Sequence, residues 1–136
     1  MHVMPPVEVV HAFLEAINRH DVAALASLMS PDHIFTDAMG ASVRGREEMR
    51  RAWVAYFFLI PDYTVDPLTV MCREQTVGVF GTARGTVSAG EALRPENHWE
   101  IPVAIRAVVW GGHVSEWQVY ADNEPVRLIL AAKGSV

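Results

Sequence analysis

The chain contains a single cysteine, Cys72, among its 136 residues. One cysteine excludes an internal disulfide and a cysteine-based metal site, and it favours a cytoplasmic protein. The first residues lack a positively charged segment followed by an apolar one, so no signal peptide is expected. The longest apolar runs, such as 54–60, are far shorter than the roughly 20 residues that cross a bilayer. We therefore expect no membrane role.

Basic residues are also few, since 11 Lys and Arg stand against 16 Asp and Glu, for a net charge of −5. The one basic cluster in the sequence consists of Arg44, Arg46, Arg50 and Arg51. A protein that binds nucleic acid normally carries a basic surface, because its partner is a line of phosphates. Nucleic acid is therefore not an expected partner.

Apolar residues, in contrast, are abundant. They make up 51% of the chain, whereas charged residues make up 20%. This balance supports a sizeable core and excludes a disordered chain. The length is typical of one domain, so we expect a single domain over residues 1–136.

The first half of the sequence predicts three helices and one short strand. Apolar residues at helical spacing predict a helix over 7–18, a short one over 21–29 with Asp21 as its N-cap, and a third over 46–58. The Ser30-Pro31 pair should end the second helix, because the residue before a proline avoids helical angles. A short strand over 33–37 follows it.

The second half predicts long strands over 63–72, 76–88, 99–110 and 113–122. The Gly111-Gly112 pair suits a two-residue hairpin turn, and the longer link over 89–97 is expected to be exposed or to form a flap. A last helical piece begins at Glu124-Pro125. Helices first and strands last indicate an α+β fold, in which a cone-shaped, curved antiparallel sheet is wrapped by the three N-terminal helices. Such a cone leaves an internal hydrophobic pocket.

The strand over 33–37 carries the most informative residues. His33, Phe35 and Asp37 share one face of it, because side chains alternate along a strand. An acid at the mouth of an apolar pocket is poorly solvated and can serve as a base. The alternative is that Asp37 faces water and caps the turn that follows, which is a common role for aspartate.

Three stretches resemble a known family. They are 13–21 (FLEAINRHD), 35–40 (FTDAMG) followed by Gly45-Arg46-Glu47, and Gly112-His113-Val114 leading to Trp117. In this order and spacing they resemble the nuclear transport factor 2-like superfamily, and within it the SnoaL-like and ketosteroid-isomerase-like group. The resemblance implies a cystatin-like cone and a homodimer that pairs through its sheets. Because the fold hosts isomerases, dehydratases, cyclases, epoxide hydrolases and non-enzymes, it leaves the activity open.

The resemblance also suggests roles for individual residues. Asp37 matches the general base of ketosteroid isomerases. The isomerase tyrosine falls at Phe13 and the protonated aspartate near Ala104, so both oxyanion donors are missing and steroid isomerisation itself is not expected. Limonene epoxide hydrolases have an acid where Val119 stands here, and that chemistry is not expected either.

Three further residues are candidates for catalysis. Counting against the isomerases places Ala104 and Arg106 on the cavity face of the strand over 99–110, where Arg106 would hold an oxyanion or pair with Asp37. The alternative is a solvated Arg106 on the outer face. His98, beside the flap, and His33 are candidate donors or acid–base groups, and exposed positions are the alternative for both. No metal or other cofactor is expected, because H-x-E over 98–100 is too short a motif for a metal site.

The large residues predict a ligand site. Phe13, Phe35, Trp53, Phe57, Ala104 and Trp117 are the expected lining of the pocket, and the alternative for the aromatic ones is ordinary core.

Three hypotheses follow. The first is an enzyme of the isomerase, cyclase or dehydratase type that performs cofactor-independent acid–base chemistry on a small hydrophobic carbonyl or polyketide-like compound. The second is a protein that binds a hydrophobic ligand without catalysis. The third is a dimerisation module whose hollow is filled by side chains.

Overall fold

The computed structural model describes residues 3–134 and confirms the α+β fold. The elements run in the order α1 (Pro6–Arg19), α2 (Val22–Leu28), β1 (Met29–Thr36), β2 (Ser42–Arg44), α3 (Arg46–Leu59), β3 (Thr64–Arg73), β4 (Thr76–Thr86), a 3-10 turn (Pro95–Asn97), β5 (His98–Trp110), β6 (His113–Tyr120) and α4 (Glu124–Gly134). All three N-terminal helices and the last helical piece are present at the predicted places.

Local chemistry explains how the first two helices begin and end. Pro6 is the first residue of α1, where its missing N–H would have no helical partner. His20 ends the helix in the left-handed conformation, with φ 57°. Asp21 then caps α2, because its Oδ1 accepts a hydrogen bond of 3.0 Å from the backbone N–H of Ala24.

The sheet has six strands in the order β2-β1-β6-β5-β4-β3. Its pairs are antiparallel except for β1 and β6, which run parallel. The Gly111-Gly112 turn joins β5 to β6 with positive φ angles of 56° and 82°, as a primed hairpin turn requires.

The region from Met29 to Arg44 differs from the prediction in two ways. The strand β1 begins at Met29, so Pro31 lies inside a strand and does not follow a helix end. It is tolerated there because the pairing with β6 is interrupted between Met29 and Ile34. The strand β2 was not predicted, and it pairs antiparallel with the end of β1.

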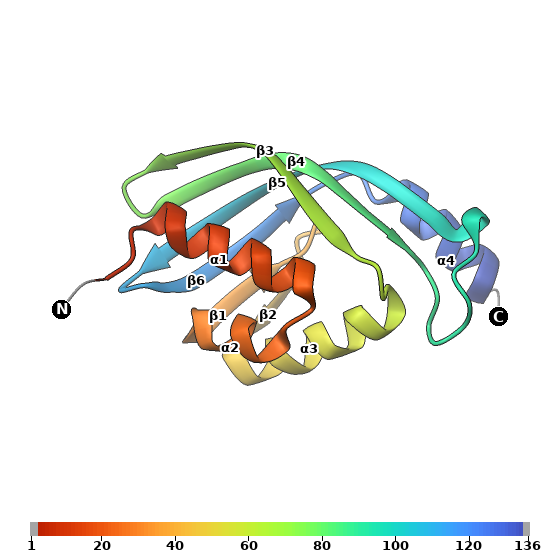
Figure 1. Ribbon diagram of the computed structural model, residues 1–136, viewed down its shortest axis with the longest axis horizontal. Coiled ribbons are helices and arrows are strands. Elements are labelled where there is room, and N and C mark those ends of the chain that lie inside the picture. The colour runs from red at the N-terminus through yellow and green to blue at the C-terminus, as the bar shows by residue number, and fades with distance from the viewer. Residues whose placement is uncertain (1–2, 135–136) are drawn as a thin grey trace.

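Curvature of the sheet creates room for a site. An irregularity between Pro67 and Thr69 of β3 lies beside Gly81 of β4, and such bulges bend a strand pair. The backbones come so close there that a Cβ on Gly81 would lie 2.1 Å from the carbonyl oxygen of Asp66. Figure 1 shows the resulting arch, with α1, α2 and α3 beneath its concave face. The core lies between this face and the helices.

Candidate ligand pocket

A cavity of about 320 Å³ lies between the concave face of the sheet and the helices α1 and α3. This volume is at the lower end of the range typical of small-molecule sites. Most of its wall is aliphatic or aromatic, and the larger side chains in it are Ile17, Phe35, Met49, Trp53, Tyr56, Tyr63, Trp99, Ile101, Ile105 and Trp117. The dimerisation-module hypothesis required a hollow filled by side chains. The cavity is open space, so this hypothesis is wrong on that point.

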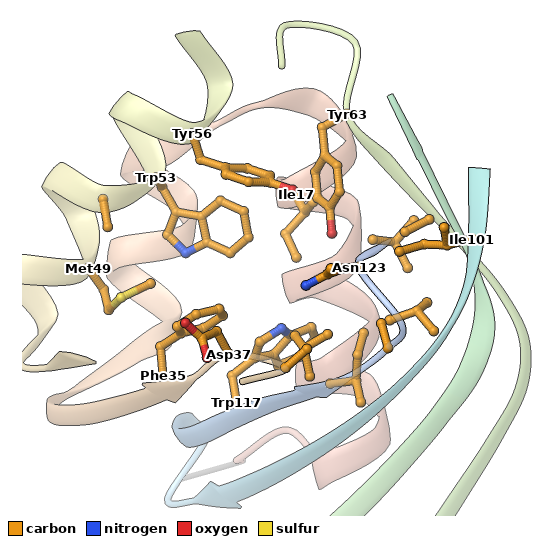
Figure 2. A pocket seen from close by; sticks show the side chains of 18 of the residues that line it. Ile17, Phe35, Asp37, Met49, Trp53, Tyr56, Tyr63, Ile101, Trp117 and Asn123 are labelled. Atoms are coloured by element: carbon orange, nitrogen blue, oxygen red, sulfur yellow. The ribbon is translucent and has the colours of Figure 1, made fainter. Parts of the chain in front are cut away.

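Asp37 lies in the wall of this cavity, next to Phe35 (Figure 2). Its side chain is partly buried. Oδ1 accepts hydrogen bonds from the backbone N–H groups of Met39, at 2.9 Å, and Ala41, at 3.0 Å. The turn after β1 thus fixes the orientation of the carboxylate. Asp37 therefore caps the turn after β1 and also lies in the cavity wall, so its position agrees with both alternatives considered from the sequence.

The cavity-facing side of β5 is the opposite of the one predicted. Trp99, Ile101, Val103 and Ile105 line the cavity, whereas Arg106 lies on the outer face. There the Nη1 of Arg106 donates a hydrogen bond of 3.0 Å to Oε1 of Glu116. The physical reason is burial. The apolar face of β5 packs toward the helices, and the face that carries the charged residues is exposed to solvent.

Ala104 was predicted as a pocket residue, and this prediction is wrong for the same reason as the one for Arg106. It lies on the outer face of the sheet, between Phe80 of β4 and Tyr120 of β6. These residues line a shallow groove of their own on that face. Ala104 therefore has no part in the cavity.

The two candidate histidines lie outside the cavity wall as well. His98 is exposed, and its Nδ1 is 3.0 Å from Oγ1 of Thr86, which itself donates to Asp62. His33 is fully buried, with Nδ1 2.7 Å from the carbonyl oxygen of Val114. Burial lowers the pKa of His33, although the hydrogen bond to Val114 opposes this. His33 is a neutral core residue at pH 7.

Among the predicted aromatic residues, Phe35, Trp53 and Trp117 lie in the cavity wall. Phe13 and Phe57 do not, because they lie one layer deeper. Phe13 is fully buried against Trp117, with the ring centroids 4.5 Å apart. Phe57 is stacked on His20, with centroids 4.2 Å apart. Both residues support the wall from behind and are core residues.

Four polar or aromatic wall residues were not singled out from the sequence: Tyr56, Tyr63, Trp99 and Asn123. The rings of Tyr56 and Tyr63 meet edge to face, with centroids 4.9 Å apart, and Trp99 lies 6.0 Å beyond Tyr63. Burial raises the pKa of both tyrosines, so their phenols stay protonated at pH 7. Helical spacing from Trp53 could have predicted Tyr56, but Tyr63 and Asn123 lie at the ends of elements, where no periodicity applies.

Within residues 3–134, no group of three or more His, Cys, Asp and Glu side chains could hold a metal ion. None of the helices described is both long and apolar enough to cross a membrane.

These features define a nuclear transport factor 2-like, ketosteroid-isomerase-like fold with an apolar cavity. The model of the SnoaL-like domain matches residues 10–119, which is most of the chain, and the chain belongs to this family. The comparison with curated proteins found no match.

Solved structures show the same fold at low sequence identity. A protein from Jannaschia sp., provisionally named a SnoaL-like polyketide cyclase, has a TM-score of 0.80 at 18% identity, with 97% of this chain and 98% of that chain covered. A polyketide cyclase, also provisionally named, from Xanthomonas campestris has a TM-score of 0.80 at 16% identity, with 91% and 96% covered. A hypothetical protein with a ketosteroid isomerase-like fold from Catenulispora acidiphila, solved in complex with trimethylamine, has a TM-score of 0.77 at 20% identity, with 90% and 91% covered.

Proposed function

We propose that this chain is a cofactor-independent enzyme that moves a proton on a small hydrophobic carbonyl or polyketide-like compound, with Asp37 as the base. One observation carries the proposal: the carboxylate of Asp37 lies in the wall of an apolar cavity, with Oδ1 held by the backbone of the following turn. Oδ2 makes no hydrogen bond within residues 3–134, and it is the oxygen that would take the proton. A fixed base in contact with substrate is what general base catalysis needs.

The proposed chemistry starts with one proton transfer. Asp37 takes a proton from the carbon next to the carbonyl; the C–H electron pair forms a carbon–carbon double bond, and the carbonyl π electrons move to the oxygen as an enolate. When the ketone is β,γ-unsaturated, the enolate is conjugated with that double bond, and return of the proton at the γ-carbon gives the α,β-unsaturated isomer. Attack of the enolate carbon on a second carbonyl closes a ring, and loss of a β-hydroxyl as water, with the proton from Asp37, gives a dehydration. One first step therefore serves all three reaction types.

Two further observations support this reaction class. The solved proteins of Jannaschia and Xanthomonas with the same fold carry the provisional name polyketide cyclase, and cyclisation is one of the reactions that an enolate permits. The wall around Asp37 is apolar, including Phe35, Met49 and Trp53, which suits an apolar substrate beside the carboxylate.

The test is hydrogen exchange of a simple ketone. We expect the protein to accelerate the incorporation of deuterium from D2O into 2-tetralone, followed by mass spectrometry against a reaction without protein. Asp37→Asn should reduce the acceleration by about 10² or more, in line with the loss of a general base. Asp122→Asn is the matched control, because Asp122 also caps a turn after a strand, accepting from the N–H of Glu124, but it lies outside the cavity wall. Equal rates for wild type and Asp37→Asn would refute the proposal.

Binding of a hydrophobic ligand without catalysis is the second candidate, and the apolar wall of the cavity favours it equally. The two differ in the role of Asp37. A binding protein would show no exchange of 2-tetralone, and its affinity for the ketone would be the same in wild type and Asp37→Asn.

We also infer that the chain forms a homodimer through the outer face of its sheet. That face carries large exposed apolar side chains: Leu68 is 75% exposed, Phe80 47% and Tyr120 50%. Phe80 and Tyr120 lie on either side of Ala104 in neighbouring strands, so they form one patch. Acidic and basic residues flank it, such as the Arg84–Glu100 pair, which allows a second copy to pair by two-fold symmetry.

A further inference from the structure

The cavity wall contains several polar groups besides Asp37, and three of them point toward the middle of the cavity. Figure 2 shows the hydroxyl of Tyr63, the indole nitrogen of Trp117 and the amide of Asn123 pointing toward the middle of the cavity. Tyr63 lies just before β3, Trp117 lies on β6, and Asn123 follows β6. Asp37 lies to one side of the three groups, beside Phe35. Segments far apart in the sequence thus bring hydrogen-bonding groups to one place.

These groups have no hydrogen-bond partner within the described chain. Trp117 is only 2% exposed, and buried N–H groups normally find an acceptor because an unpaired one is costly. The indole nitrogens of Trp53 and Trp99 also lack partners, but they are closed off by neighbouring atoms. The nitrogen of Trp117 and the polar atoms of Tyr63 and Asn123 are not closed off in this way. A ligand in the cavity is therefore the partner that these groups can reach.

The three groups can all donate. The indole N–H is a donor only, and the asparagine amide offers an N–H group. Burial raises the pKa of Tyr63, which keeps its hydroxyl proton in place. Three donors that line one small cavity match an oxygen atom that accepts several hydrogen bonds, such as a carbonyl oxygen or an enolate.

The charge of the wall narrows the class of ligand. Among the described residues that line the cavity, Asp37 is the one charged residue, and none is Lys, Arg or His. A carboxylate or phosphate would be repelled by Asp37 and would have no cation to pair with. An ammonium group would be attracted by Asp37 but would leave the three donors without an acceptor. A neutral compound with an acceptor oxygen satisfies both parts of the wall.

We propose that Tyr63, Trp117 and Asn123 form the carbonyl-oxygen site of this pocket, and that its ligand is a neutral apolar compound bearing a ketone oxygen. The proposal rests on the proposed function and extends it: as Asp37 takes the proton, these donors stabilise the negative charge that develops on the oxygen. They take the part that the sequence had suggested for Arg106 and His98, which lie outside the cavity.

A panel of four probes of similar size tests the site by isothermal titration calorimetry. The probes are 2-tetralone (a neutral ketone), tetralin (the hydrocarbon without oxygen), 5,6,7,8-tetrahydro-2-naphthoate (an anion) and trimethylphenylammonium (a cation). We expect the wild type to bind 2-tetralone about tenfold more tightly than tetralin, since a few hydrogen bonds give this factor. The anion and the cation should bind more weakly than the ketone.

Variants then locate the oxygen site. Tyr63→Phe and Asn123→Ala should each lower the preference for ketone over hydrocarbon by several-fold, and the double variant should abolish it, while tetralin affinity stays unchanged. Tyr120→Phe is the matched control, because Tyr120 is half exposed on the outer face of the sheet and should keep the full preference. Unchanged tetralin affinity also shows that a variant is folded.

The outcomes separate this inference from the proposed function. Asp37→Asn should lose the exchange reaction but keep the preference for ketone, because the donors remain. A wild type that shows the preference but no exchange supports the oxygen site and refutes the enzyme. Exchange activity with a ketone preference that survives in the double variant would refute the oxygen site alone. Tighter binding of the anion or cation, or no binding of any probe, would refute the proposed ligand class.

Discussion

The side chain of Asn18 on α1 is hydrogen-bonded to the backbone of Val65 on β3 in both directions. Its Nδ2 donates to the carbonyl oxygen of Val65 at 2.9 Å, and its Oδ1 accepts from the N–H of Val65 at 2.9 Å. The two residues are 47 positions apart, so the pair ties the first helix to the start of the long hairpin. Val65 lines the cavity, as does Ile17, the residue before Asn18. The Asn18–Val65 pair thereby sets the spacing of helix and sheet at the cavity.

We predict that Asn18→Ala lowers the free energy of unfolding by about 1–3 kcal/mol, because it leaves the buried N–H of Val65 without an acceptor. Urea denaturation followed by circular dichroism measures the change. Ser27→Ala removes an exposed hydroxyl from α2 and should change the value by less than about 0.5 kcal/mol. Equal midpoints for Asn18→Ala and wild type would show that the Asn18–Val65 pair contributes nothing to stability.

Two substitutions of Asp37 should separate its structural role from its proposed chemical one. Asn keeps an oxygen that can accept from Met39 and Ala41, so Asp37→Asn should alter stability by less than about 0.5 kcal/mol. Asp37→Ala leaves both N–H groups of the turn without the side-chain oxygen and should cost about 1 kcal/mol. Thermal unfolding gives the stabilities, and deuterium exchange of 2-tetralone gives the activity. Both variants should lose the activity to a similar degree, and activity retained by Asp37→Asn would contradict the role as base.

Most of the fold could be predicted because the elements that build it are long and strongly periodic. The alternation from Trp99 to Val109 and the helical stripe around Trp53 reflect burial of one face, which is the force that places these elements. The strand β2 escaped prediction because all three of its residues are exposed, so no apolar alternation marks it. The early start of β1 was missed because Pro31 indicates a break when it is judged without its sheet partner.

The candidate site was harder to predict than the fold. The position of Asp37 at the end of a strand was visible in the sequence, but its contact with the cavity depends on how far the sheet curves. For β5, the alternation of apolar residues alone would have placed Ile101 and Ile105 on the inner face. Matching positions to those of ketosteroid isomerases assigned Ala104 and Arg106 to that face instead, which was wrong. Tyr63 and Asn123 lie in one cavity only because of the fold, since the chain separates them by four strands.

The buried His33 predicts how stability depends on pH. Its pKa is lowered by burial, so below its ordinary value of 6.5 the unfolded chain binds a proton that the folded chain does not. Stability is therefore fully present above pH 6.5 and falls as the pH is lowered, by at most about 1.4 kcal/mol per pH unit for one proton. The hydrogen bond to Val114 and the neighbouring charge of Asp32 act in the opposite direction, so they make the lowering of the His33 pKa smaller and reduce the total loss of stability.

Denaturation midpoints measured between pH 7.5 and pH 5 test this dependence. His33→Phe removes the titrating group while keeping an aromatic ring beside Phe13, so it should flatten the decline even if it lowers overall stability. His11→Phe replaces an exposed histidine of α1 and should leave the slope as in wild type. A slope that is the same in all three proteins would assign the acid sensitivity to other groups.

The proposed dimer gives the last prediction. If a second copy covers the outer face of the sheet, the half-exposed ring of Phe80 is buried in the assembly, and Phe80→Glu would place a carboxylate without a partner there. We expect light scattering at micromolar concentration to give a dimer for wild type and a monomer for Phe80→Glu. Val54→Glu is the matched control, because Val54 is also an exposed apolar residue, at 56%, but lies on α3 away from this face. The control should stay dimeric, and a monomeric wild type would contradict the pairing through the sheet while leaving the cavity and its proposed chemistry unaffected.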